Sequence, residues 1–212
     1  MERLQFITHE KVQETPVRQT ELFCRGGGNW VQFRMKSCEN YQELKSEALQ
    51  VQSVCKKYGA IFIINDYVQL CKEIGADGVH LGKNDMPIAE ARKILGDQAI
   101  IGATANDSET VELLLQEDVD YIGLGPFRFT KTKEGLAPLL GIDGYEKIMN
   151  NLQRKNISLP VIAIGGINPE DISAICQTGV HGIAVSLAIA QSIEIEHITK
   201  EFLNKLQIQC NL

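Results

Sequence analysis

The first candidates for chemistry are polar residues that alternate with apolar ones in a short predicted strand. Residues 31–36 read VQFRMK. Because successive side chains of a strand point to opposite faces, Gln32, Arg34 and Lys36 share one face. Arginine offers a planar fork of donors and lysine a compact charge, and this combination suits a diphosphate. The pattern predicts an anion site at the end of this strand, with the solvated face of an edge strand as the alternative.

Two carboxylates follow the next two predicted strands, which cover residues 60–64 and 78–81. Asn65 and Asp66 come directly after the first of these strands, and Asp85 follows the second. If the strands are parallel neighbours, their carboxyl ends meet, and both aspartates lie beside the predicted anion site. Carboxylates next to a phosphate are typical ligands of Mg²⁺. The sequence therefore predicts a metal site at Asp66 and Asp85, with helix capping by either aspartate as the alternative.

A long stretch without periodicity, residues 125–141, follows the sixth predicted strand. It contains Thr130, Lys131, Thr132 and Lys133, whose hydroxyl and ammonium groups can surround a phosphate. Long loops in compact domains are usually functional. The residue types alone leave a phosphate site and a solvated loop as equal alternatives, with Lys131 as the expected bystander.

The last two predicted strands end in residues that suit a second phosphate site. Gly166 allows close backbone approach before a helix that starts at Asn168, and Val185 and Ser186 lead from the eighth strand into another helix. Barrels often bind phosphate between these two loops through backbone N–H groups. A pair of ordinary turns is the alternative. Thr104, which follows the fifth strand, is weak evidence by itself, because such a threonine more often serves a turn.

No pair of residues indicates covalent catalysis. His80 lies inside a predicted strand, where a lone histidine is more often a packed residue with satisfied hydrogen bonds. No cysteine or serine shows a pairing with a base. The residues therefore predict two anion pockets and one metal ion, without an obvious nucleophile.

Alternating strand and helix patterns carry these residues. Strands are predicted at 4–7, 30–35, 60–64, 78–81, 99–103, 120–124, 160–164 and 182–185. Stripes with helical spacing fall between them, such as Leu44, Ala48, Val51 and Cys55, and residues 106–109 and 168–171 resemble helix starts. Eight such units predict an α/β fold, a single-domain (β/α)8 TIM barrel over residues 1–212. The runner-up is a doubly wound sheet, but no Gly-x-Gly-x-x-Gly follows the first strand.

Composition narrows the classes of function. The chain has 212 residues and a net charge of −6, which disfavours a nucleic-acid partner. No run reaches the roughly 18 apolar residues of a membrane helix, so no membrane partner is expected. The expected partners are small-molecule substrates. The six cysteines form no Cys-x-x-Cys pair and are expected as reduced thiols, which indicates the cytoplasm. The sequence leaves open whether the protein forms a homo-oligomer.

Together these segments resemble the thiamine phosphate synthase family. The resemblance extends from about residue 30 to residue 186. It is carried, in order, by residues 31–36, Asn65-Asp66, residues 75–82 (GADGVHLG) with Asp85, residues 120–126 (DYIGLGP), Thr130-x-Thr132-Lys133 and residues 163–167 (AIGGI). Any one piece is weak, but the ordered set is highly specific.

The resemblance implies a transferase that joins hydroxymethylpyrimidine diphosphate to a thiazole phosphate, carboxylated or not. The products would be thiamine phosphate and diphosphate, formed by a dissociative mechanism that Mg²⁺ assists. The resemblance assigns the pyrimidine diphosphate to Gln32, Arg34, Lys36, Asn65, Thr104 and Lys133, with Arg34, Lys36 and Lys133 as the catalytic cations. It assigns Mg²⁺ to Asp66 and Asp85, and the thiazole phosphate to Thr130, Thr132, Gly166, Val185 and Ser186.

Two rivals and a few departures accompany this resemblance. A thiazole tautomerase-like barrel should lack the threonine–lysine pattern, and a non-catalytic thiazole-phosphate-binding barrel could lack the metal site. The family usually has serine where Thr104 stands. Arg128 and Phe129 stand where it is often apolar and proline.

Overall fold

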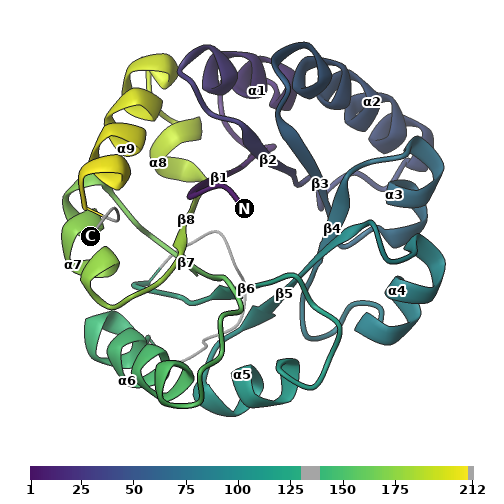
Figure 1. The fold of residues 1–212 in the computed structure, drawn as a ribbon. Helices are drawn as coiled ribbons and strands as arrows, with labels where there is room; N and C mark the ends of the chain where they lie inside the picture. Colours follow the sequence, from purple (N-terminus) through teal and green to yellow (C-terminus); the bar gives the residue numbers. More distant parts are fainter. Residues whose placement is uncertain (130–138, 210–212) are drawn as a thin grey trace.

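Eight parallel strands close into a barrel in the computed structural model, each paired with the next in chain order and β8 paired back to β1 (Figure 1). The structure describes residues 1–129 and 139–209. The strands are β1 (Leu4–Ile7), β2 (Trp30–Phe33), β3 (Ile61–Asn65), β4 (Gly78–Leu81), β5 (Ile100–Ala105), β6 (Tyr121–Leu124), β7 (Val161–Ile164) and β8 (Gly182–Val185). The predicted (β/α)8 barrel is confirmed.

Helices surround the barrel and connect successive strands (Figure 1). They are α1 (Pro16–Arg25), α2 (Tyr41–Tyr58), α3 (Val68–Ile74), α4 (Ile88–Leu95), α5 (Ser108–Leu114), α6 (Gly141–Arg154), the 3₁₀ turn η1 (Pro169–Asp171), α7 (Ile172–Gln177), α8 (Leu187–Ala190) and α9 (Ile195–Gln209). None of the helices described is long and apolar enough to cross a membrane.

Helix α2 shows how the sequence sets the local structure. Asn40 caps its start by accepting hydrogen bonds from two backbone N–H groups, and Gly59 ends it in the left-handed conformation. The predicted stripe through Leu44, Ala48 and Val51 is buried against the sheet. Both helix-start signals are also confirmed, since residue 107 caps α5 and a capping box opens η1.

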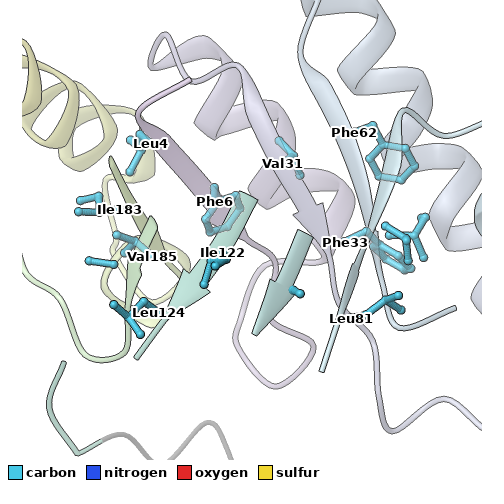
Figure 2. Close-up of a cluster of buried hydrophobic side chains, with 14 of the residues drawn as sticks. Leu4, Phe6, Val31, Phe33, Phe62, Leu81, Ile122, Leu124, Ile183 and Val185 are labelled. Atoms are coloured by element: carbon cyan, nitrogen blue, oxygen red, sulfur yellow. The ribbon is translucent and has the colours of Figure 1, made fainter. Parts of the chain in front are cut away.

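The two faces of the strands pack into two separate cores. Outward-facing residues meet the helices, and Figure 2 labels several of them, among them Phe6, Val31 and Phe33. Inward-facing residues fill the barrel and include Trp30 and Tyr121, whose rings meet edge to face with centroids 5.1 Å apart. The predicted alternation is therefore correct as far as Phe33, and Gln32 points inward.

Two strand ends differ from the sequence prediction. Strand β2 stops at Phe33 rather than at residue 35, because the N–H of Arg34 donates to the Thr8 hydroxyl (3.0 Å) instead of to a backbone carbonyl. Strand β5 runs two residues further than predicted and includes Thr104, which pairs with Gly123 of β6. Arg34 and Lys36 therefore lie in the connection that leaves the barrel.

Among the five cysteines that the structure describes, the prediction of reduced thiols is wrong at one position, and Cys210 lies outside the described residues. Cys24, Cys38, Cys55 and Cys71 are free thiols, and burial raises the pKa of Cys24 and Cys71 to about 12. Cys176, in contrast, is disulfide-bonded. The buried thiols fill the outer core, as small apolar residues would.

Candidate active site

A continuous chain of hydrogen-bonded side chains crosses the barrel interior. The Gln32 amide donates to Gln5 Oε1 (3.2 Å), and Gln5 Nε2 donates to the Tyr121 hydroxyl (3.1 Å). His80 contacts that hydroxyl through Nδ1 (3.0 Å) and Thr104 Oγ1 through Nε2 (3.0 Å). The chain links Gln32 and Thr104, two residues that the family resemblance assigns to the pyrimidine diphosphate.

Glycines on the inner faces of β5 and β6 make room for the rings in this chain. A Cβ atom at Gly102 would lie 2.1 Å from Cζ of Tyr121, and one at Gly123 would lie 2.9 Å from Cε1 of His80. A side chain at either glycine position would therefore clash with the ring beside it. Burial raises the pKa of Tyr121, so its hydroxyl stays protonated at neutral pH.

Charged groups meet where β2, β3 and β4 end. The Lys36 ammonium lies 2.7 Å from Asp66 Oδ2. Burial raises the pKa of Asp66, a hydrogen bond from Lys36 opposes that rise, and the neighbouring Asp85 carboxyl adds to it. The predicted approach of the two aspartates is thus present, with a cation beside them.

Neither aspartate caps a helix. The N-cap residues of α3 and α4 are Tyr67 and Pro87, and neither cap has a side-chain hydrogen bond. Asp85 instead accepts the N–H of Gly82 (2.6 Å). Asp66 has a φ angle of 68°, a conformation that is uncommon outside glycine and that concentrates at functional sites. The capping alternative is therefore wrong for both residues.

Two buried polar atoms without a hydrogen-bond partner among residues 1–129 and 139–209 belong to predicted ligand residues. They are Nδ2 of Asn65 and Oγ of Ser186. Buried polar groups are normally satisfied, so an orphaned one needs a particular explanation. Asn65 ends β3 beside Asp66, and Ser186 follows β8. A bound ligand would supply the missing hydrogen-bond partner of both atoms.

The second predicted pocket lies between β7 and β8. Ile164 pairs with Ala184, and this register brings Gly166 level with Ser186 just beyond the strand ends. Gly166 has a φ angle of 68°. Val185, the last residue of β8, is buried and pairs with Phe6 of β1.

Arg128, which sequence reasoning treated only as a departure, lies over Gly166 of this predicted site. A Cβ at Gly166 would lie 2.6 Å from Cγ of Arg128, so the arginine stem passes over the glycine. The guanidinium pairs with Asp171 and lies over the Phe127 ring, 4.9 Å from its centroid. The N–H of Arg128 donates to the carbonyl of Gly165 (3.1 Å), which fixes the start of the β6–α6 connection on the end of β7.

The remaining predicted residues, Thr130, Thr132 and Lys133, lie outside the described residues. Sequence reasoning missed two members of the polar chain, Gln5 and Tyr121. Gln5 carried a usable signal, since it is a polar residue in the short apolar strand 4–7, as Gln32 is in 31–36. The expectation that His80 is packed with its hydrogen bonds made is confirmed, but one of its partners is Thr104.

The carboxylate pair fits a magnesium ion. Two carboxylates close enough to raise a pKa favour a cation between them, and Asp66 and Asp85 meet beside the Lys36 cation. Among the described residues, no group of three or more His, Cys, Asp or Glu side chains gathers in this way. Mg²⁺ commonly takes one or two protein carboxylates and completes its octahedron with water and substrate phosphates.

The fold and this arrangement define a (β/α)8 barrel whose C-terminal mouth gathers cations, carboxylates and hydroxyls, as in enzymes that act on phosphorylated small molecules. The chain belongs to the thiamine monophosphate synthase family, whose model matches residues 4–189.

Curated relatives and a solved structure agree with this assignment. The chain is 48% identical to the thiamine-phosphate synthase of Phocaeicola vulgatus, over 95% of this chain and 96% of that one. It is 46% identical to the enzyme of the same name from Bacteroides thetaiotaomicron, over 98% and 99%. The thiamine phosphate pyrophosphorylase of Pyrococcus furiosus superposes with a TM-score of 0.86 at 29% identity, covering 97% of this chain and 96% of that one.

Proposed function

We propose that this enzyme joins hydroxymethylpyrimidine diphosphate to thiazole phosphate and releases thiamine phosphate and diphosphate. The observation that carries the proposal is the meeting of Lys36, Asp66 and Asp85 at the barrel mouth, beside the inner chain that ends in Gln32 and Thr104. Membership of the family supports the same reaction.

The first step breaks the bond between the methylene carbon and the diphosphate oxygen. The electron pair leaves with the diphosphate, and the aminopyrimidine ring stabilises the methylene cation that remains. Arg34, Lys36 and Lys133 bind the leaving group and neutralise its growing charge. Asp66 and Asp85 would hold Mg²⁺, which would supply further positive charge for the diphosphate.

The second step forms the new carbon–nitrogen bond. The thiazole nitrogen donates its electron pair to the cation, so no protein nucleophile is needed. Gly166, Val185, Ser186, Thr130 and Thr132 bind the acceptor phosphate. Holding the acceptor in line replaces a bimolecular encounter by a reaction within the complex.

A diphosphate-release assay with both substrates and Mg²⁺ tests the proposal. The wild type should turn over only when both substrates are present, and Lys133→Ala and Asp66→Ala should lose at least about a hundredfold in kcat, as removal of one stabilising donor does elsewhere. Lys131→Ala is the matched control, because it removes a neighbouring lysine that carries no predicted role. Running the assay with carboxylated and uncarboxylated thiazole phosphate identifies the preferred acceptor.

Other outcomes of this assay separate the rivals. Tight binding of thiazole phosphate without turnover would favour a tautomerase-like or non-catalytic barrel instead. We also propose that the enzyme works in the cytoplasm. The four free thiols support that location, and the disulfide of Cys176 does not. That the enzyme forms a homo-oligomer remains a prediction, which light scattering can test.

A further inference from the structure

The polar chain inside the barrel has two ends, and both ends are predicted pyrimidine ligands. Its inner members are shielded from solvent: Gln5 is 1% exposed, Tyr121 0% and His80 6%. Gln32 and Thr104 end the chain on β2 and β5. A change at one end can therefore reach the other through protein groups alone.

The hydrogen bonds of this chain run in one direction. The Tyr121 hydroxyl has one proton. Gln5 Nε2 donates to it and the Gln32 amide also approaches it, so its own proton goes to His80 Nδ1. A neutral imidazole then carries its proton on Nε2 and donates to Thr104 Oγ1. This leaves the Thr104 proton for a ligand.

All hydrogen bonds of this polar chain share one direction of donation, because each central group accepts a hydrogen bond on one side and donates one on the other. Reversing a single link would set two donors or two lone pairs against each other in a buried place. Full reversal would need both amides to flip, the tyrosine proton to turn and the histidine to change tautomer. Gln32 donates into the chain and so keeps its amide oxygen as an acceptor, while Thr104 is a donor.

An aminopyrimidine has an amino donor next to a ring-nitrogen acceptor. The corresponding oxopyrimidine shows the reverse, a carbonyl acceptor next to a ring N–H donor. We propose that Tyr121 and His80 are positioning residues that hold Gln32 as an acceptor and Thr104 as a donor, and thereby select an aminopyrimidine diphosphate over its oxo analogue. The inference rests on the proposed function and adds the origin of its selectivity.

Calorimetric titration of the full chain with the amino- and oxopyrimidine diphosphates tests the inference without requiring turnover. One neutral hydrogen bond contributes a factor of about two to ten, so two matched ends should give the wild type a preference of about four- to a hundredfold for the amino form. Tyr121→Phe should reduce the preference to about threefold or less. KM for thiazole phosphate should stay unchanged in that variant.

Tyr145→Phe is the matched control. Tyr145 is as buried as Tyr121, but its hydroxyl donates to the carbonyl of Leu124 (2.7 Å) in the outer core. This variant should keep the full preference. If Tyr121→Phe does not fold, Gln5→Met cuts the same chain with a side chain of similar volume.

A double-mutant cycle measures the coupling directly. Thr104→Val should weaken binding of the amino form about tenfold in the wild type and about twofold or less beside Tyr121→Phe. Equal losses in both backgrounds, a preference that survives in Tyr121→Phe and Gln5→Met, or an equal loss in Tyr145→Phe would overturn the inference. Such results from an enzyme that still turns over would leave the proposed function standing, whereas a wild type that binds no pyrimidine diphosphate would overturn both.

Discussion

Replacing Gly166 by alanine should damage the acceptor pocket more than it damages the fold. Gly166 has a φ angle of 68°, and a residue with a Cβ pays about 1–2 kcal/mol for that conformation. For a chain of this size such a loss lowers Tm by roughly 2–8 °C. The new Cβ would also lie 2.6 Å from Cγ of Arg128, so the arginine stem must move away from its position over the glycine.

Gly59→Ala separates these two effects. Gly59 has the same φ angle of 68°, but a Cβ there would meet no atom of the described residues within 4 Å. It ends α2 on the outside of the barrel. The two variants should therefore lose similar stability, while only Gly166→Ala disturbs a predicted ligand site.

Steady-state kinetics and thermal unfolding of both variants test this reasoning. KM for thiazole phosphate should rise at least about tenfold in Gly166→Ala, which corresponds to about 1.4 kcal/mol of lost binding. KM for the pyrimidine diphosphate should stay within about twofold in both variants. A thiazole phosphate KM that stays at the wild-type value in Gly166→Ala, or rises equally in Gly59→Ala, would refute the reasoning.

Three further variants test other contacts. Burial and the neighbouring Asp85 raise the pKa of Asp66 above its usual 3.8, so the native state loses stability as the pH rises through the raised pKa. Without metal, the Asp66→Asn variant should therefore have a higher Tm than the wild type at pH 7, measured by calorimetry. Gly102→Ala places a Cβ 2.1 Å from the buried Tyr121 ring, and this overpacking should cost about 1–3 kcal/mol in denaturant unfolding. Arg128→Ala should raise KM for thiazole phosphate several-fold while Tm falls by no more than roughly 4 °C, because its pair with an acidic side chain is partly exposed.

Each of these variants has an outcome that contradicts its premise. For Asp66→Asn it is an unchanged or lower Tm at pH 7, or a Tm that Mg²⁺ raises as much as it raises that of the wild type. For Gly102→Ala it is wild-type stability, which would mean that the Tyr121 ring can move. For Arg128→Ala it is an altered KM for the pyrimidine diphosphate alone, and Arg128→Lys, which keeps the charge, should recover part of the acceptor affinity.

The local elements were predictable because they depend on short-range patterns. Alternation over residues 31–36 gave the inward face of Gln32, and the stripe through Leu44, Ala48 and Val51 gave the buried face of α2. The aspartates after β3 and β4 were placed together correctly, since consecutive parallel strands end side by side. These inferences need only the chain order and the period of each element.

Tertiary structure decided the features that join distant parts of the chain. The Thr8 hydroxyl, 26 residues away, ends β2 before Arg34, and Arg128 meets Asp171 across 43 residues. No local pattern records such contacts.

The polar chain shows the same division most clearly. Its five members come from β1, β2, β4, β5 and β6, and only barrel closure brings them together. The sequence by itself determined which residue types reach the mouth of the barrel. Closure and strand register, which depend on the packing of all eight strands at once, decided which of those residues touch.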